Sequence, residues 1–332
     1  NVKVRDQAST NFCWAYATLG SAESALGFLD YKNGSTNTIY DFSERHLAYG
    51  SRRNAFINNQ INEYGATKDI KSGGNFYEAQ TYLSNGMGAI KEAEMPFENN
   101  MNNIDISKIK NKTVTTTLYD TVWFETTETT DTVALMSKMK QYISTYGGIY
   151  AGVHGASLFS DAYNNSTGAL YCNDPDTFLA DHAVTIIGWD DNYSRENFNE
   201  EIRPIKNGAW IVKNSWGENV SYTLEEIKDQ MYEANKDFFN GVNINSPQDI
   251  PDEFIEEYYK SLYGEDKVSI SNGNITITIG NDGYMYVSYE DVNIYDSLSA
   301  VQKISATKDY DNIYQHDELG SGVSMYFTGQ KK

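Results

Sequence analysis

The chain has 332 residues, of which 40% are hydrophobic and 14% aromatic, and its formal net charge is −20. This length and composition are typical of a globular protein with one large domain or two. The acidic charge argues against nucleic acid as a partner, because no clustered Lys and Arg side chains are present to neutralise phosphates, and no apolar run is long enough to predict a transmembrane segment.

Near its start the sequence predicts a buried helix that begins at a cysteine. A polar run from Gln7 to Asn11 leads into an apolar segment from Cys13 to Leu29, in which apolar residues recur at helical spacings. A thiol in the first turn of a helix lies near unpaired backbone N–H groups and the positive end of the helix dipole, which favour the thiolate. We therefore expect Cys13 to have a lowered pKa and to act as a nucleophile; the alternative is an ordinary buried cysteine.

Two further features follow in the first third of the chain. Ser43 is a predicted N-cap with His46 at the third helical position, so we expect His46 to be a structural histidine at a helix end. Gly73 and Gly74 precede a third helix, predicted over Glu78–Leu83. A glycine pair usually marks a turn, but the lack of side chains also lets an extended peptide backbone approach closely.

The middle of the chain predicts a strand, a helix and a second strand. The strand covers Val114–Glu125, the amphipathic helix Asp131–Ser144, and the buried strand Gly147–Val153. His154 ends that second strand, and we interpret it as structural.

Two short motifs then supply a histidine and an asparagine. Asp181 and His182 begin the sequence Asp-His-Ala-Val, and Asn214 begins the sequence Asn-Ser-Trp-Gly, which contains Trp216. A histidine is the general base that a thiol nucleophile needs. An amide side chain can orient the imidazole without competing for its proton.

Residues 218–282 predict a unit with its own secondary structure. One helix is expected over Tyr222–Phe239, and a second begins with Pro251 at its first position and ends at Gly264. A β-hairpin follows over Val268–Ile279 with a type I′ turn at Asn272-Gly273. A segment of this length between two motifs usually carries structure or function of its own.

Taken together, the motifs resemble those of papain-like cysteine peptidases. In that family a glutamine stands six residues before the nucleophile, as Gln7 does before Cys13, and the histidine and asparagine motifs follow in the same order. The resemblance implies an α+β, papain-like two-lobed fold. We expect a mainly helical left lobe over residues 1–112, a β-barrel-like right lobe over 113–297 that contains the inserted subdomain 218–282, and a tail over 298–332.

The resemblance also implies a mechanism and a set of site residues. Cys13, His182 and Asn214 would form a catalytic triad, and Gln7 with the backbone N–H of Cys13 would bind the oxyanion. The substrate-binding residues it implies are Gly73, Gly74, Phe76, Gly152, Asp181 and Trp216. Phe76, Gly152, Ala180 and Ala183 would form a small apolar subsite for the side chain two residues before the cut. The polar loop Asp190–Ile205 is expected at the rim of the cleft, solvated or, alternatively, holding calcium. No metal or cofactor is otherwise expected.

Relatives from plants and lysosomes have a disulfide near the nucleophile. Thr10 and Lys71 stand where its two cysteines would be, so we expect no disulfide, a free thiol at Cys172, and a bacterial or archaeal branch. The tail, around 308–316, resembles a linker into a lectin-like domain.

The expected partners are a polypeptide substrate, a propeptide and that lectin-like domain, and the expected location is secreted or cell-surface. Endopeptidase activity is the predicted function. The alternatives are an adhesion module without activity and an acyl transferase that uses an amine instead of water.

Overall fold

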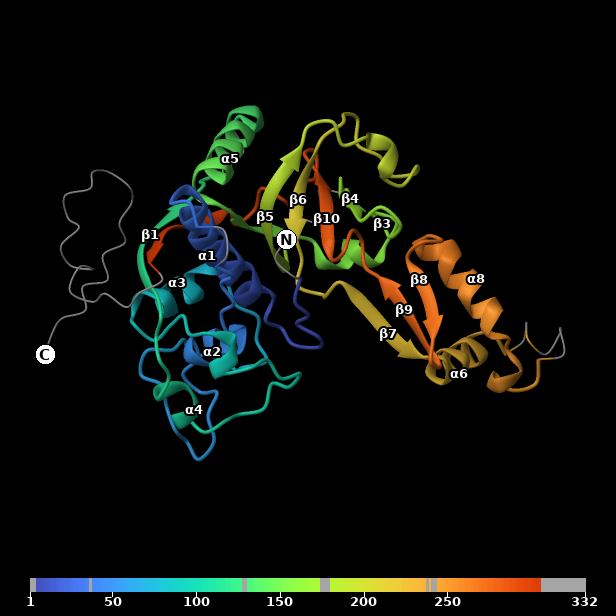
Figure 1. Cartoon of the computed structure of the whole chain (residues 1–332), viewed down its shortest axis with the longest axis horizontal. Helices are drawn as coiled ribbons and strands as arrows, with labels where there is room; N and C mark the ends of the chain where they lie inside the picture. Colours follow the sequence, from blue (N-terminus) through green and yellow to red (C-terminus); the bar gives the residue numbers. More distant parts are fainter. Residues whose placement is uncertain are drawn as a thin grey trace, which may run out of the picture.

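The computed structural model describes residues 4–35, 38–126, 130–173, 180–236, 239 and 244–305. Its helical half is built around α1 (Cys13–Lys32), which lies between the other helices and a large sheet (Figure 1). Because α1 is covered from both sides, most of its residues are buried, polar ones such as Thr18 and Ser21 included. The predicted start of this helix at Cys13 is confirmed.

Shorter helices complete the left lobe: α2 (Glu44–Gly50), η1 (Glu92–Glu94), α3 (Phe76–Ser84) and α4 (Ser107–Lys110). The predicted cap of α2 is present, since the Ser43 hydroxyl accepts a hydrogen bond from the backbone N–H of His46 at 3.0 Å. Asn75 caps α3 in the same way, accepting from the N–H of Glu78 at 3.1 Å.

The right lobe is an eight-stranded sheet in the order β1-β11-β2-β5-β6-β10-β4-β3. All neighbours are antiparallel except β10 and β4. The strands are β1 (Thr117–Trp123), β2 (Ile149–Val153), β3 (Tyr163–Asn164), β4 (Ala169–Leu170), β5 (His182–Asp190), β6 (Ala209–Lys213), β10 (Tyr284–Ser288) and β11 (Ser299–Ser305). Helix α5 (Thr132–Tyr146) packs beside β5, and its N-cap is Asp131. The short helices η2 (Gly155–Phe159) and η4 (Arg195–Asn197) follow β2 and β5.

The structure corrects the boundary of this lobe. The sequence prediction assigned residues from 298 onward to a tail. Instead, Ser299–Ser305 form β11, which pairs with β1 on one side and with β2 on the other. The rest of the predicted tail, with its resemblance to a linker, lies outside the described residues.

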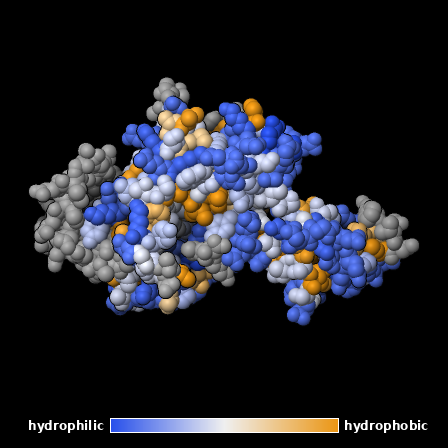
Figure 2. Space-filling model, turned by 45° about the horizontal axis from the view of Figure 1, so that its top comes forward, coloured by the Kyte–Doolittle hydropathy of each residue, from blue (hydrophilic) through white to orange (hydrophobic). Residues whose placement is uncertain are grey.

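The insertion forms a separate small unit with a three-stranded sheet, β7-β9-β8, and its own apolar core of Ile227, Ile255, Ile275 and Ile277. Its elements are β7 (Asn219–Thr223), α6 (Leu224–Ala234), η5 (Pro247–Asp249), α8 (Asp252–Tyr263), β8 (Val268–Ser271) and β9 (Asn274–Thr278). It projects from the body of the molecule and its surface is mostly hydrophilic (Figures 1 and 2).

Most predictions for the insertion are confirmed. The hairpin turn has positive φ at Asn272 (52°) and Gly273 (73°), as a type I′ turn requires. Three details were wrong. Helix α6 ends at Ala234 and does not extend to Phe239. Tyr222 belongs to a strand, because a capping box of Thr223 and Glu226 starts α6 only at residue 224. Pro251 is the N-cap of α8 instead of its first helical residue.

The loop between β5 and β6 does not lie where the sequence analysis placed it. His182 is the first residue of β5 and Asp190 the last, and Asp190 pairs with Ala209 at the start of β6. A nine-residue strand spans about 26 Å, so residues 191–208 lie at the far end of the sheet from His182. The expectation of a loop at the rim of the cleft was therefore wrong.

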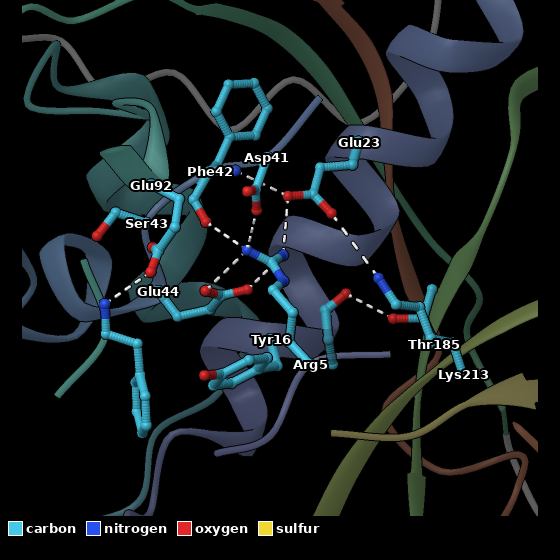
Figure 3. Close-up of polar contacts among 12 residues, drawn as sticks. Arg5, Tyr16, Glu23, Asp41, Phe42, Ser43, Glu44, Glu92, Thr185 and Lys213 are labelled. Carbon is cyan, nitrogen blue, oxygen red and sulfur yellow. Dashed lines mark hydrogen bonds and ion pairs between the residues drawn. The ribbon is translucent and has the colours of Figure 1, made fainter. Parts of the chain in front are cut away.

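Arg5 ties the start of the chain to the helical half, and its partner Glu23 links this cluster to the sheet through Lys213 (Figure 3). Its guanidinium lies 2.6 Å from Asp41, 2.9 Å from Glu23 and 2.5 Å from Glu44, and Lys213 of β6 lies 3.9 Å from Glu23. Burial raises the pKa of Glu44 to about 8 although Arg5 opposes this shift. These contacts fix the segment that leads into Gln7 and Cys13. Among the described residues no helix is long and apolar enough to cross a membrane.

Candidate active site

Four candidate residues come from ends of elements that meet near the start of α1. Cys13 is the first residue of α1, His182 the first of β5, and Asn214 directly follows β6. Gln7 lies on the segment before α1, where its backbone N–H donates to Ser215 O at 2.8 Å. The fold therefore brings the nucleophile motif and the asparagine motif into direct contact, across about 200 residues of sequence.

The pair His182 and Asn214 has defined geometry. The imidazole Nε2 lies 2.8 Å from Asn214 Oδ1, and both residues are buried, with exposed fractions of 7% and 5%. Asn214 Oδ1 also accepts the backbone N–H of Ser215 at 2.8 Å, and its Nδ2 contacts Met285 Sδ at 3.6 Å. Because Oδ1 is an acceptor only, His182 must donate from Nε2, which leaves Nδ1 as the basic nitrogen of the neutral ring.

The ionisation of Cys13 differs from the sequence prediction. Burial raises the pKa of the Cys13 thiol above its ordinary value, and the carboxylate of Asp181 raises it further, while hydrogen bonding to the backbone of Ala183 opposes this. The direction of this shift is opposite to the predicted lowering, because burial of the thiol disfavours the charged thiolate. Burial likewise lowers the pKa of His182, against the hydrogen bond to Asn214.

Gln7 is held by hydrogen bonds on both ends of its amide. Its Oε1 accepts from the Ser215 hydroxyl at 2.7 Å, and its Nε2 donates to Thr10 O at 2.7 Å. Since Nε2 carries two hydrogens, one remains for another acceptor. The sequence analysis did not single out Ser215. Its hydroxyl fixes the orientation of the Gln7 amide, with Oε1 toward Ser215 and Nε2 toward Thr10.

Trp216 covers the histidine. Its ring lies 5.0 Å from the His182 ring, centroid to centroid, and Phe159 of η2 stacks on it at 5.3 Å. Phe159 is 82% exposed, which is unusual for so large an apolar side chain. Asp181 accepts the N–H of Gly155 at 2.5 Å, so its carboxylate also fixes the start of η2.

The two glycines of the predicted substrate segment have different surroundings. A Cβ on Gly74 would overlap the indole of Trp14, so only glycine fits against that ring. Gly73 has no atom within 4 Å of the place a Cβ would occupy. The segment is therefore packed on one side and open on the other.

The remaining subsite candidates are less open than expected. Phe76 is 2% exposed and packs edge-on against Trp123 at 5.2 Å and Tyr150 at 5.5 Å. At Gly152 a Cβ would overlap the methyl group of Ala180. Phe76 is thus a packed core residue. Burial raises the pKa of Tyr150, which the sequence analysis missed, and the charge of nearby Cys13 raises it further.

His46 and His154 make hydrogen bonds typical of structural histidines. His46 is fully buried, with Nδ1 2.5 Å from the Tyr82 hydroxyl and Nε2 3.0 Å from Ile109 O. His154 Nδ1 lies 2.8 Å from the Ser157 hydroxyl. His316 lies outside the described residues.

Neither Cys13 nor Cys172 forms a disulfide. In the part of the chain that the structure describes, no group of three or more His, Cys, Asp or Glu side chains is arranged to hold a metal ion, and this includes residues 190–205.

The sequence profile of the family described as papain family cysteine protease matches residues 2–223. The chain belongs to this family. Membership agrees with the observed α+β, two-lobed architecture, in which a helical lobe and a sheet lobe are joined near Cys13. The match ends at the first strand of the insertion, so most of the insertion lies beyond it. No curated protein sequence matches the chain significantly.

Papain-like proteases of known structure share this fold. A clostridial cysteine protease, Cwp84 after propeptide cleavage, has 23% identity and a TM-score of 0.62, over 93% of this chain and 56% of that one. A structure of the protease and lectin-like domains of Cwp84, a surface layer associated protein of Clostridium difficile, has 23% identity and a TM-score of 0.61, over 94% and 50%. SERA5E of Plasmodium falciparum has 14% identity and a TM-score of 0.53, over 93% and 92%. The chain thus spans about half of each Cwp84 chain.

Proposed function

We propose that this protein is a thiol endopeptidase in which Cys13 is the nucleophile, His182 the acid and base, and Asn214 the residue that orients the imidazole. The observation that carries the proposal is the hydrogen bond of 2.8 Å between His182 Nε2 and Asn214 Oδ1. It assigns the ring proton to Nε2 and so leaves Nδ1 to accept the thiol proton. Family membership supports the same reaction class.

The chemistry follows from these assignments. Cys13 transfers its proton to His182 Nδ1, and its sulfur attacks the scissile carbonyl to form a tetrahedral adduct. The imidazolium then protonates the departing amine, and the C–N bond breaks to leave a thioester. Water, deprotonated by the same nitrogen, attacks the thioester, which releases the carboxylic acid and regenerates the thiol. Each proton that His182 accepts is returned, so the cycle needs no metal or cofactor.

The raised pKa of the Cys13 thiol and the lowered pKa of the His182 imidazole affect the first step, the proton transfer from Cys13 to His182. Both shifts come from burial, and both favour the neutral pair in the substrate-free protein. Moving one proton from Cys13 to His182 keeps the net charge of the pair at zero, so the ion pair costs less than either charge alone. We therefore propose that the reactive ion pair forms by this transfer, with the bond to Asn214 stabilising the imidazolium.

Gln7 is the proposed side-chain donor of the oxyanion hole, together with the backbone N–H of Cys13. The Ser215 hydroxyl and Thr10 carbonyl hold its amide, and one Nε2 hydrogen is left for the substrate oxygen. A preorganised donor of this kind is worth about 10²- to 10³-fold in rate.

For substrates, we propose an extended polypeptide whose backbone pairs with Gly73 and Gly74, and an apolar side chain two residues before the cut. The small side chains Ala180 and Ala183 near Gly152 support the second part. By analogy with Cwp84, described as surface layer associated and as having a propeptide and a lectin-like domain, we propose that the protein acts outside a bacterial cell and belongs to a longer precursor.

The insertion is proposed to select the part of the substrate after the cut. It leaves the chain directly after Trp216 and rejoins it at β10, beside the asparagine motif, and residues 218–282 hold 14 acidic and 4 basic side chains. Basic residues after the cut should therefore be favoured. Deleting 219–281 with a short linker should remove a preference for lysine over glutamate there; an unchanged preference would assign the insertion a structural role.

The first experiment is labelling by an epoxide inhibitor of papain-like peptidases, read by intact mass, beside cleavage of an unfolded protein. The unmodified protein should take up one inhibitor and cleave, and Cys13→Ala should do neither. A matched control is Cys172→Ala, which should do both. If the folded protein is neither labelled nor active, the proposal is wrong, and an adhesion module without activity becomes the favoured hypothesis. Adding a primary amine distinguishes transfer from hydrolysis, because a transferase would give an amide product.

A further inference from the structure

Arg52 is a buried arginine directly beside the segment proposed to bind substrate. Its side chain is 1% exposed. Nη2 donates hydrogen bonds to two successive backbone carbonyls, Ser72 O at 3.1 Å and Gly73 O at 3.0 Å. Nη1 forms an ion pair with Glu78 on α3, so the guanidinium joins the glycine segment to the helix that follows it.

The same guanidinium also contacts the residue next to the nucleophile. The Arg52 guanidinium carbon lies 4.9 Å from the ring centroid of Trp14, in a cation–π arrangement. That indole is the group against which Gly74 packs. Arg52 and Gly74 therefore share one aromatic surface, and this surface is rigidly attached to Cys13 through the backbone of α1.

A third hydrogen bond, from Asn11, also holds the glycine segment. Asn11 Nδ2 donates to Lys71 O at 2.7 Å, which ties the approach to α1 to the residue two before the glycine pair. The carbonyls of three consecutive residues, from Lys71 to Gly73, are thus held by side chains.

We propose that Arg52 is a positioning residue: its buried guanidinium, assisted by Asn11, holds the Gly73–Gly74 segment at a fixed place relative to Cys13. The inference rests on the proposed function, because it assigns to this segment the binding of substrate backbone. A guanidinium suits the role, since its planar fork can serve two carbonyls and a carboxylate at once, which a lysine ammonium on a flexible stem cannot.

A purely structural role for Arg52 makes a different prediction. Loss of fold stability would lower the activity toward every substrate by the same factor. Loss of positioning would affect only substrates whose backbone extends along the glycine segment. The two are separated by comparing an ester substrate with one amino-acid residue, acetyl-glycine p-nitrophenyl ester, with one that adds a second residue, acetyl-phenylalanyl-glycine p-nitrophenyl ester.

The experiment measures kcat and KM of both esters for the unmodified protein, Arg52→Lys and Arg52→Met. The matched control is Arg53→Lys, the same change at the exposed neighbouring arginine. For Arg52→Lys we expect kcat/KM of the two-residue ester to fall about 10- to 100-fold, mainly through KM, as expected for two weakened backbone hydrogen bonds. The one-residue ester should change less than about threefold.

Hydrogen exchange of the backbone amides provides a readout that does not require activity. In Arg52→Lys, amides of residues 70–75 should lose protection while those of α1 keep theirs, and Arg53→Lys should match the unmodified protein. The inference would be overturned if Arg52→Lys lowered kcat/KM of both esters by the same factor, or if the amides of residues 70–75 kept their protection. If the unmodified protein hydrolyses neither ester, the proposed function fails, and the exchange experiment still decides whether Arg52 positions the segment.

Discussion

Burial of His46 predicts a specific dependence of stability on pH. The imidazole is fully buried, and burial lowers its pKa to about 4 from an ordinary value of 6.5. Nε2 donates to Ile109 O and Nδ1 accepts from the Tyr82 hydroxyl, so the neutral ring is satisfied at both nitrogens. Protonating Nδ1 would replace that acceptor with a donor facing another donor.

The sign and size follow from proton linkage. Between pH 6.5 and 4 the unfolded chain binds a proton at His46 that the folded protein does not, so the free energy of unfolding falls as the pH falls. At about 1.4 kcal/mol per pKa unit, the full difference is about 3 kcal/mol, of which about 2 kcal/mol is lost between pH 7 and pH 5. At pH 7 the penalty is close to zero, because both states are then mostly neutral.

The assay is urea unfolding of the unmodified protein and His46→Gln at pH 7, 6 and 5. Other titrating groups affect both proteins and cancel in the difference. The variant should be less stable at pH 7, because it loses buried hydrogen bonds, and the gap should narrow by about 2 kcal/mol at pH 5. A gap that is constant with pH would refute the reasoning, provided that the m-values of the two proteins agree.

Two further predictions concern residues that hold the site in place. Ser215→Ala removes the hydroxyl that fixes Gln7 Oε1, so kcat on a peptide substrate should fall about 5- to 30-fold with little change in KM. The control Ser221→Ala, in the insertion, should leave kcat unchanged. Gly74→Ala places a methyl group against the indole of Trp14, so we expect KM to rise at least about tenfold and the melting temperature to fall. The control is Gly73→Ala: its methyl group meets no atom within 4 Å, so the melting temperature should not change.

The parts of the site that could be predicted from sequence are those whose chemistry is confined to a few neighbouring residues. Cys13 with its preceding Gln7, and Asn214 with Trp216, each lie within a short motif. The helix start at Cys13 and the cap at Ser43 also depend on local signals, and both are as predicted.

What could not be predicted depends on residues that meet only in the fold. Arg52 contacts carbonyls some twenty residues away, and neither its type nor its neighbours indicate this. The direction of the Cys13 pKa shift was not predicted either, because the position at the helix start indicates a lowered pKa whereas burial of the thiol raises it. The sequence analysis assigned the residues of β11 to the tail, and only pairing with β1 and β2 shows that Ser299–Ser305 belong to the sheet.

The directions of two strands place the two long segments that follow them at different distances from His182. β5 runs away from His182 and β6 returns to Asn214, so the loop over 191–208 joins their far ends, about 26 Å from the histidine. The insertion over 218–282 begins at the near end, directly after Trp216, and half of the chain's charge of −20 lies within it. Of these two segments, the insertion is therefore the one that we expect to influence substrate choice through its charge, because the acidic side chains of the far loop lie about three Debye lengths from the histidine at physiological ionic strength.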